Sequence, residues 1–167
     1  FTAKHKKDNK SLSLTARSAG TDMSGGAIND SIIVDFSKYF TAIKKVGKTT
    51  AHIQPGVFYR DFDLETIKHD SLMPSYPASR ELCTIGGMVA NNAGGEKSLE
   101  FGKTEKFVSE LKVVFADGNE YTVKPLTKAQ LVKKMAQGDY EGNLYKDLFE
   151  LIEKNYDRIK AAEPQVS

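Results

Sequence analysis

The chain has 167 residues, of which 40% are hydrophobic and 28% charged, and this suits a soluble globular protein of one domain or two small lobes. Its 24 Lys and Arg residues nearly balance 22 Asp and Glu residues, so the formal net charge of +2 is too small to indicate a nucleic-acid-binding protein. No stretch approaches the ~20 consecutive apolar residues of a membrane-spanning helix, and no transmembrane segment is predicted.

The residues that most often bind metals or form disulfides are few and scattered. Cys83 is the single cysteine and cannot form an internal disulfide, which favours a reducing compartment. We therefore expect a cytoplasmic protein, with peripheral attachment to a membrane as the alternative. His5, His52 and His69 stand far apart and outside any metal-ligand signature, so no metal site is predicted.

The first half of the chain is predicted to be rich in strands. Phe1–Lys10 has the pattern of the second half of a basic, solvated helix, and because translation begins at Met, a chain that begins with Phe is expected to be a fragment. The alternation in Ser11–Thr15 predicts a half-buried strand, and the apolar run 32–34 predicts a buried one that ends at Asp35. Residues 42–46 and 49–54 form a hairpin in this interpretation.

The second half alternates between helices and extended segments. Apolar residues recur at helical spacing from Val57 to Asp70, whereas Pro74 and Pro77 exclude a helix from the next stretch. Residues 107–116 and 121–123 predict a second hairpin around Asp117-Gly118. Two final helices are predicted over 127–137, with Thr127 as a cap, and over 142–162.

A glycine-rich loop lies between the first two predicted strands. Glycine has no Cβ and tolerates positive φ, so successive backbone N–H groups can surround an anion while hydroxyl groups add donors. A plain turn explains such a loop about as well, and the loop matches neither a P-loop nor a Rossmann fingerprint. The candidate ligand-binding residues here are Arg17, which could supply charge at the edge, Ser18, Ala19, Gly20, Thr21, Asp22, Ser24, Gly25 and Gly26.

A second cluster of small residues is more specific. A run with little side-chain bulk, interrupted by amide and hydroxyl groups, can line a trough in which a flat ring system lies. The alternative is a tightly packed crossing of small-residue helices, for which Asn is a poor choice. The candidate residues are Pro77, Ala78, Ser79, Thr84, Ile85, Gly86, Gly87, Ala90, Asn91, Asn92, Gly94 and Gly95.

Together the two clusters resemble the FAD-linked oxidoreductases with a flavin domain of the p-cresol methylhydroxylase and vanillyl-alcohol oxidase type. The sequence is most similar to the branch that contains D-lactate dehydrogenase, D-2-hydroxyglutarate dehydrogenase and the glycolate oxidase flavin subunit. The resemblance extends from about Leu14 to Val123 and includes Phe101-Gly102 and the hairpin Val114–Gly118. Tyr76 and Phe101 depart from it, since many relatives have an acidic residue and a Tyr there.

The resemblance implies an α+β fold with a first lobe over 1–54 and a second over 55–167, and with FAD between them. Arg17–Gly26 would enclose the pyrophosphate, and Pro77–Gly95 would run beside the flavin, so that any Cβ on Gly86 or Gly87 would intrude on it. Covalently flavinylated relatives have a His where Thr21 stands here, which implies non-covalent FAD.

The activity implied for the whole protein is hydride transfer from a 2-hydroxy acid to the flavin. The substrate cap and the catalytic residues would lie outside this chain, so the chain alone is expected to be inactive, and its uncovered apolar surface could cause self-association. The alternatives are a flavin reductase of the same superfold, such as the cell-wall precursor reductases, and a non-enzymatic nucleotide-binding or interaction module.

Overall fold

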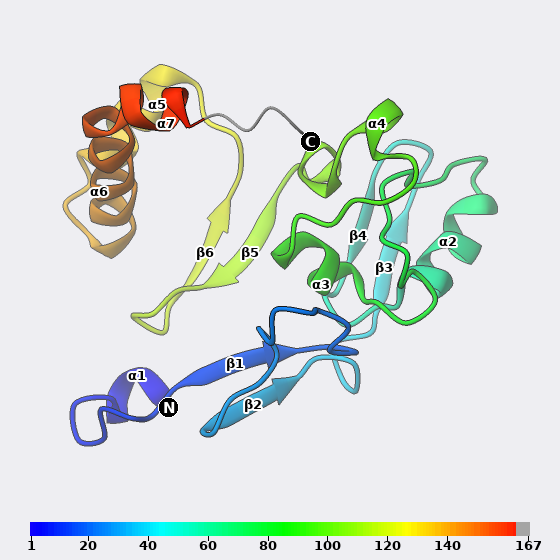
Figure 1. The fold of residues 1–167 in the computed structure, drawn as a ribbon, viewed down its shortest axis with the longest axis horizontal. Helices are drawn as coiled ribbons and strands as arrows, with labels where there is room; N and C mark the ends of the chain where they lie inside the picture. The colour runs from blue at the N-terminus through cyan, green and yellow to red at the C-terminus, as the bar shows by residue number, and fades with distance from the viewer. Residues whose placement is uncertain (163–167) are drawn as a thin grey trace. The chain divides into compact units, whose positions relative to one another are not determined.

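The protein is described by a computed structural model over residues 1–162 (Figure 1). Within this range the α-helices are α1 (Thr2–His5), α2 (Tyr59–Ile67), α3 (Ile85–Ala90), α4 (Ser98–Phe101), α5 (Lys128–Met135), α6 (Tyr140–Lys154) and α7 (Tyr156–Ala161), with a 3-10 turn η1 (Thr104–Phe107). The strands are β1 (Leu14–Arg17), β2 (Ile32–Asp35), β3 (Ile43–Val46), β4 (Ala51–Ile53), β5 (Leu111–Val114) and β6 (Glu120–Val123). The predicted α+β fold is confirmed.

The chain divides into two compact units, and the division falls between Ser109 and Glu110. The first unit contains α1 to η1, and the second contains β5 to α7. The boundary between lobes that the resemblance places after Gln54 stays a prediction.

The first unit begins with a parallel pair, β1 and β2, in which Leu14 lies opposite Ile32 and Arg17 opposite Asp35. The strand was predicted over Ser11–Thr15, but it begins three residues later. Asn9 Oδ1 accepts hydrogen bonds from the N–H of Ser11 (3.1 Å) and from its hydroxyl (2.7 Å), and this local turn keeps Ser11 out of the strand. The longer helix expected in Phe1–Lys10 is likewise only the single turn α1.

The predicted hairpin of β3 and β4 is confirmed. The two strands are antiparallel, and Gly47 N–H donates to Thr50 O at 2.9 Å to close the turn. The helix expected from Val57 to Asp70 is present but shorter. Phe58 is extended and bridges Thr84, and this leaves Tyr59 as the first residue of α2.

The core of the first unit lies between α2, α3 and the extended segment that joins them. Tyr59 and Met88 are almost fully buried, and the Tyr59 hydroxyl donates to Met73 O at 2.8 Å. Burial raises the pKa of this phenol above its ordinary value, so Tyr59 stays neutral. The core residues are Val57, Tyr59, Phe62, Tyr76, Cys83, Ile85, Met88 and Ala93.

In the second unit the predicted hairpin β5–β6 is confirmed, and it precedes three helices where the sequence predicted two. Thr127 caps α5 in a reciprocal capping box with Gln130. Asp139 caps α6, and the ring of Tyr140 lies 6.4 Å from that of Phe115 beyond β5. The single helix predicted over 142–162 is interrupted at Asn155, whose side-chain amide donates to Leu151 O at 2.8 Å.

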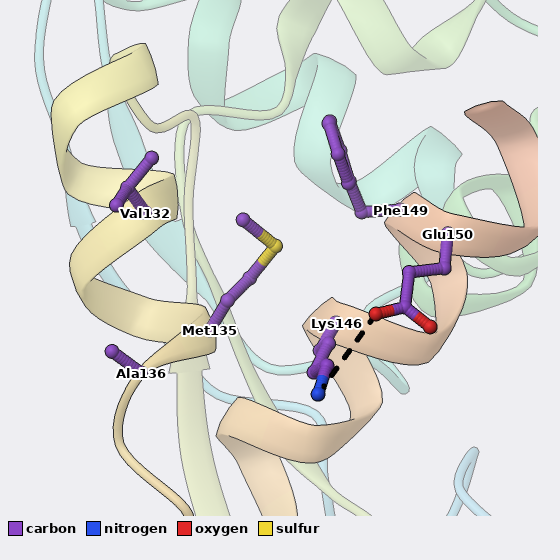
Figure 2. Close-up of a pocket in the computed structure, with 6 residues that line it drawn as sticks. All are labelled: Val132, Met135, Ala136, Lys146, Phe149 and Glu150. Atoms are coloured by element: carbon purple, nitrogen blue, oxygen red, sulfur yellow. Dashed lines mark ion pairs between the residues drawn. The ribbon is translucent and has the colours of Figure 1, made fainter.

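Helices α5 and α6 pack against each other and leave a shallow groove between them (Figure 2). Met135 points into the space between the helices, and Phe149 stands on the α6 side. Deeper in the pair, Lys134 Nζ binds Glu141 Oε2 at 2.7 Å with both side chains largely buried. The groove is lined by Val132, Met135, Ala136, Lys146, Phe149 and Glu150.

Replacement of Met88 by Ala should destabilise the first unit. Met88 is 1% exposed in the core, so the variant loses buried contacts and leaves a cavity, at a cost of about 2–5 kcal/mol in the free energy of unfolding. Urea unfolding followed by circular dichroism measures this cost. The matched control is Met23→Ala, because Met23 is fully exposed and its removal should change stability by less than about 0.5 kcal/mol. Equal effects of the two substitutions would contradict the assignment of the core.

Candidate functional site

The first loop leaves β1 at Arg17 and is held in shape by that residue. Arg17 Nη1 donates to Ala27 O at 3.2 Å, across the base of the loop. A Cβ on Gly20 would lie 2.6 Å from Arg17 Nη2, so glycine makes room for the guanidinium. Arg17 therefore stabilises the conformation of the loop, whereas the sequence suggested that it supplies charge for a ligand at the edge of the loop.

Asp22 closes the far side of the same loop. Its carboxylate accepts hydrogen bonds from the Ser24 N–H (3.2 Å), the Ser24 hydroxyl (2.7 Å) and the Gly26 N–H (2.9 Å). These bonds, those from Ser24 first, hold the pKa of Asp22 below its ordinary value. Asp22 is thus ionised at neutral pH, and its carboxylate accepts hydrogen bonds from groups of the same loop.

The tip of the loop presents backbone donors. Among residues 1–162, the N–H groups of Ala19–Met23 make no hydrogen bond to a protein acceptor. Gly20 has φ +66°, a conformation that glycine adopts without strain. Because unpaired backbone donors seek an acceptor, five consecutive ones on an exposed loop suit an anionic group with several oxygens.

The N-terminus of α3 is occupied by the protein itself. Ile85 N–H donates to Val57 O (2.9 Å), Gly86 N–H donates to Pro55 O (2.8 Å), and the Thr84 hydroxyl accepts from Gly87 N–H. The first three N–H groups of this short helix are therefore satisfied. The unpaired backbone donors of this region lie in the first loop.

The two glycines of α3 differ in what they face. A Cβ on Gly86 would lie 2.5 Å from Pro55 Cβ and 2.8 Å from Pro55 O, so this glycine permits close packing. A Cβ on Gly86 would therefore meet the protein itself, as the packing alternative expects, and its effect on a bound flavin stays a prediction. A Cβ on Gly87 would lie 3.2 Å from Ser18 Oγ and faces the first loop.

Two contacts bring the first loop against the second cluster. The Thr21 hydroxyl donates to Ser79 Oγ at 3.3 Å, although the two residues are 58 positions apart. Ser18 lies beside Gly87. The clusters that the sequence singled out separately are therefore neighbours in the first unit, and the free N–H groups of the loop lie at their junction.

The end of the second cluster is a tight turn fixed by hydrogen bonds. Asn92 has φ +44° and ends α3 in a Schellman motif, with Ala93 N–H donating to Met88 O at 2.8 Å. Asn92 Oδ1 accepts a hydrogen bond from Glu105 N–H at 3.0 Å, so the Asn92 side chain fixes the backbone at Glu105. A Cβ on Gly95 would lie 2.1 Å from Tyr76 O, and the turn packs directly on the preceding extended segment.

Several predicted residues make no hydrogen bond to the first loop within residues 1–162. Gly102, with φ +87°, ends α4, and Phe101 is 40% exposed. Ala78, Ala90 and Asn91 are exposed on the surface of the second cluster. Pro77 and Gly94 are half-buried beside the turn, so the roles of this whole group toward a ligand stay predictions.

Tyr76 departs from the family pattern, and its surroundings explain how it is accommodated. Its hydroxyl donates to Glu96 Oε1 at 2.8 Å, and this bond raises the pKa of the phenol. The guanidinium of Arg80 lies 5.0 Å from the ring centroid. Tyr76 thus anchors the segment that precedes Pro77.

The sequence did not predict the structural role of several residues that shape the site. Pro55 and Val57 supply the carbonyls that hold the start of α3, whereas the sequence indicated only that a helix begins at Val57. Ser75 and Thr104 are fully buried, and their hydroxyls both donate to Ala93 O. A hydroxyl residue inside an apolar stretch, as at Ser75, is the signal that could have indicated this role.

Within residues 1–162 no three His, Cys, Asp or Glu side chains gather as a metal site would require. No helix in that range combines the length and the apolar character needed to cross a bilayer. Cys83 is buried, and this burial raises the pKa of its thiol to about 11, so it is a neutral core residue.

Substitution of the two α3 glycines should have different effects. Gly86→Ala places a methyl group against the Pro55 backbone and should lower the free energy of unfolding by about 1–3 kcal/mol. Gly87→Ala meets only two hydroxyl oxygens, at 3.2 and 3.5 Å, and should leave stability within about 1 kcal/mol. Thermal denaturation of the two variants compares them directly. A larger loss for Gly87→Ala would show that the packing around α3 is misassigned.

Comparison with known proteins identifies the region that contains both clusters. The profile of the FAD binding domain family matches residues 6–124. The D-2-hydroxyglutarate dehydrogenase of Haemophilus influenzae is 33% identical over 111 residues, which are 65% of this chain and 11% of that protein. The D-lactate dehydrogenase of Archaeoglobus fulgidus is 32% identical over 111 residues, or 65% of this chain and 25% of that protein.

A third relative matches nearly the whole chain. The D-2-hydroxyglutarate dehydrogenase of Pseudomonas putida is 25% identical over 158 residues, which are 93% of this chain and 16% of that protein. The chain thus spans between about a tenth and a quarter of the length of these three relatives.

Among solved structures, 6-hydroxy-D-nicotine oxidase from Arthrobacter nicotinovorans superimposes with a TM-score of 0.63 at 22% identity, covering 78% of this chain and 28% of the oxidase. This likeness concerns the fold. Together with the family profile, which spans the first loop and the second cluster, it shows that the chain belongs to the FAD binding domain family of flavin-linked oxidoreductases.

Proposed function

We propose that this chain holds FAD non-covalently in an oxidoreductase that oxidises a 2-hydroxy acid. The observation that carries the proposal is the run of unpaired N–H groups over Ala19–Met23, next to the Thr21 and Ser79 hydroxyls. A pyrophosphate offers the several anionic oxygens that such a run can bind. Bound FAD would supply the redox chemistry by accepting a hydride.

Different residues of the chain would contact different parts of FAD. The N–H groups of Ala19–Met23 would hold the pyrophosphate, while Arg17 and Asp22 keep the loop in shape from its two sides. The exposed backbone and amide groups at Ala90–Asn91 would face the rest of the cofactor. Residues 16–27 contain no His or Cys that could form a bond to the flavin, and this supports non-covalent binding.

The longest of the three alignments supports D-2-hydroxyglutarate over D-lactate or glycolate as the substrate, although the H. influenzae D-2-hydroxyglutarate dehydrogenase aligns over the same 65% of the chain as the D-lactate dehydrogenase. The P. putida D-2-hydroxyglutarate dehydrogenase aligns over 93% of the chain and therefore beyond residue 124, where the family profile stops. The A. fulgidus D-lactate dehydrogenase aligns over 65%. The groups that contact the substrate are expected in the remainder of the polypeptide, since no catalytic base is assigned in this chain.

Replacement of Asp22 by Asn should weaken FAD binding. The neutral amide cannot accept strong hydrogen bonds from both Ser24 and Gly26, so the loop should lose the shape that aligns its N–H groups. We expect the Kd for FAD to rise about tenfold, which corresponds to about 1.4 kcal/mol. Titration followed by flavin fluorescence measures it in the full-length apoprotein.

The control for this experiment is Asp30→Asn. Asp30 is exposed near the end of the same connection and makes no hydrogen bond with its side chain among residues 1–162, so its replacement should leave the Kd unchanged. If Asp22→Asn bound FAD as tightly as Asp30→Asn, the carboxylate would not be part of the binding loop.

The full-length protein should release FAD on mild acid treatment and should reduce an artificial acceptor with D-2-hydroxyglutarate. We expect its kcat/KM to exceed that for D-lactate and for glycolate by at least about tenfold, a difference of about 1.4 kcal/mol in transition-state binding. The chain alone, supplied with FAD, should be inactive, since hydride transfer needs a positioned substrate and a base. Flavin that stays attached to the protein, or turnover of none of the three acids, would overturn the corresponding part of the proposal.

A further inference from the structure

Tyr76 is held against the connection between α3 and α4 by both its backbone and its side chain. A Cβ on Gly95 would lie 2.1 Å from Tyr76 O, so the main chain of Tyr76 packs directly on this connection. The Tyr76 hydroxyl donates to Glu96 Oε1, in the next residue of the connection, at 2.8 Å. A carboxylate acceptor makes this hydrogen bond stronger than one between neutral groups. Two adjacent residues thus fix both ends of Tyr76.

The ring of Tyr76 is enclosed by its neighbours as well. Tyr76 is 7% exposed, and its ring centroid lies 5.3 Å from that of Tyr59 in the core. The guanidinium carbon of Arg80 lies 5.0 Å from the same centroid. A ring packed in this way cannot change its rotamer without displacing core side chains. Tyr76 therefore has one defined position, from which the chain continues into Pro77.

The turn that follows carries this position on to Ser79. The ring of Pro77 fixes its φ, and Pro77 O accepts a hydrogen bond from Arg80 N–H at 3.0 Å. Ser79 O accepts one from Cys83 N–H at 2.9 Å. Since these bonds keep the turn in shape, the place of Ser79 depends on where Tyr76 lies, three residues earlier.

Ser79 is the residue through which this turn contacts the first loop. The Thr21 hydroxyl donates to Ser79 Oγ at 3.3 Å. Among residues 1–162 this is the only hydrogen bond that joins residues 18–26 to the second cluster. Thr21 is also the central residue of Ala19–Met23, whose N–H groups are unpaired. The direction of these N–H groups therefore depends on Ser79.

We propose that Tyr76 and Glu96 are positioning residues for FAD binding. Their hydrogen bond fixes Ser79, and Ser79 in turn orients Thr21 and the N–H groups on either side of it. The inference rests on the proposed function, because it takes the anion held by these N–H groups to be the pyrophosphate of FAD. It adds two residues that lie outside the predicted set of binding residues.

Removal of a single hydroxyl tests the role of Tyr76. In the full-length protein, Tyr76→Phe keeps the ring but removes the donor to Glu96. We expect the Kd for FAD, from titration of the apoprotein followed by flavin fluorescence, to rise about fivefold. The matched control is Tyr39→Phe, which should leave the Kd unchanged, because Tyr39 is 80% exposed and its hydroxyl makes no hydrogen bond among residues 1–162. Equal Kd values for the two variants would overturn the proposal.

Two substitutions of Glu96 test the acceptor, and because this side chain is exposed they should not disturb folding. Glu96→Ala should raise the Kd as Tyr76→Phe does. Glu96→Gln keeps a side-chain oxygen that can accept from the hydroxyl, so its Kd should stay within about twofold of that of the unsubstituted protein. The control is Glu100→Ala, since Glu100 is exposed and its side chain makes no hydrogen bond within the described residues. Equal Kd values for Glu96→Gln and Glu96→Ala, or a loss of thermal stability in Glu96→Ala without a change in its Kd, would contradict a positioning role.

A double-mutant cycle shows whether Tyr76 acts through Ser79. Ser79→Ala alone should raise the Kd, and Tyr76→Phe added to it should raise the Kd by less than about twofold more, because the contact through which it acts is already lost. A further fivefold rise would overturn the proposal. If the unsubstituted full-length protein bound no FAD, the proposed function would fail together with this inference, whereas FAD binding that is insensitive to Tyr76 and Glu96 would overturn the inference alone.

Discussion

The site depends on three places where backbone packs directly on backbone. A Cβ would lie 1.8 Å from Phe36 O at Gly56, 2.8 Å from Pro55 O at Gly86 and 2.1 Å from Tyr76 O at Gly95. No side chain can be accommodated at these separations, so glycine is required at each position. These approaches hold the start of α3 and the turn after it against the rest of the first unit, and they set the position of the second cluster.

The packed framework contrasts with the loop it supports. At the start of α3 each N–H group has a protein acceptor, and the Ala93 carbonyl accepts from three donors, the N–H and hydroxyl of Thr104 and the hydroxyl of Ser75. In the first loop the side chains of Arg17 and Asp22 fix the two sides while the N–H groups between them stay unpaired. Backbone donors are therefore satisfied where they support the structure and free where a ligand is proposed.

Patterns that act over a few residues were predictable from the sequence. The two hairpins, the Thr127 cap and the position of both glycine-containing clusters follow from turn residues, alternation and small size. What the sequence could not supply were contacts between distant residues. The Thr21–Ser79 bond joins positions 58 residues apart, and only the fold reveals that Gly86 faces Pro55 while Gly87 faces Ser18. The strand predicted at Ser11 failed for a local reason, since the Asn9 side chain competes for its backbone.

The unpaired donors also connect cofactor binding with stability. A ligand that accepts hydrogen bonds from Ala19–Met23 binds the folded loop and not the unfolded chain, so it stabilises the first unit by mass action, by about 2.7 kcal/mol at a hundred times its Kd. Because Thr21 and Ser18 contact the second cluster, that stabilisation reaches α3 and the core around Met88. The bound cofactor would then contribute to the stability of the first unit, because it would supply the hydrogen-bond acceptors that the protein does not provide for the N–H groups of the loop.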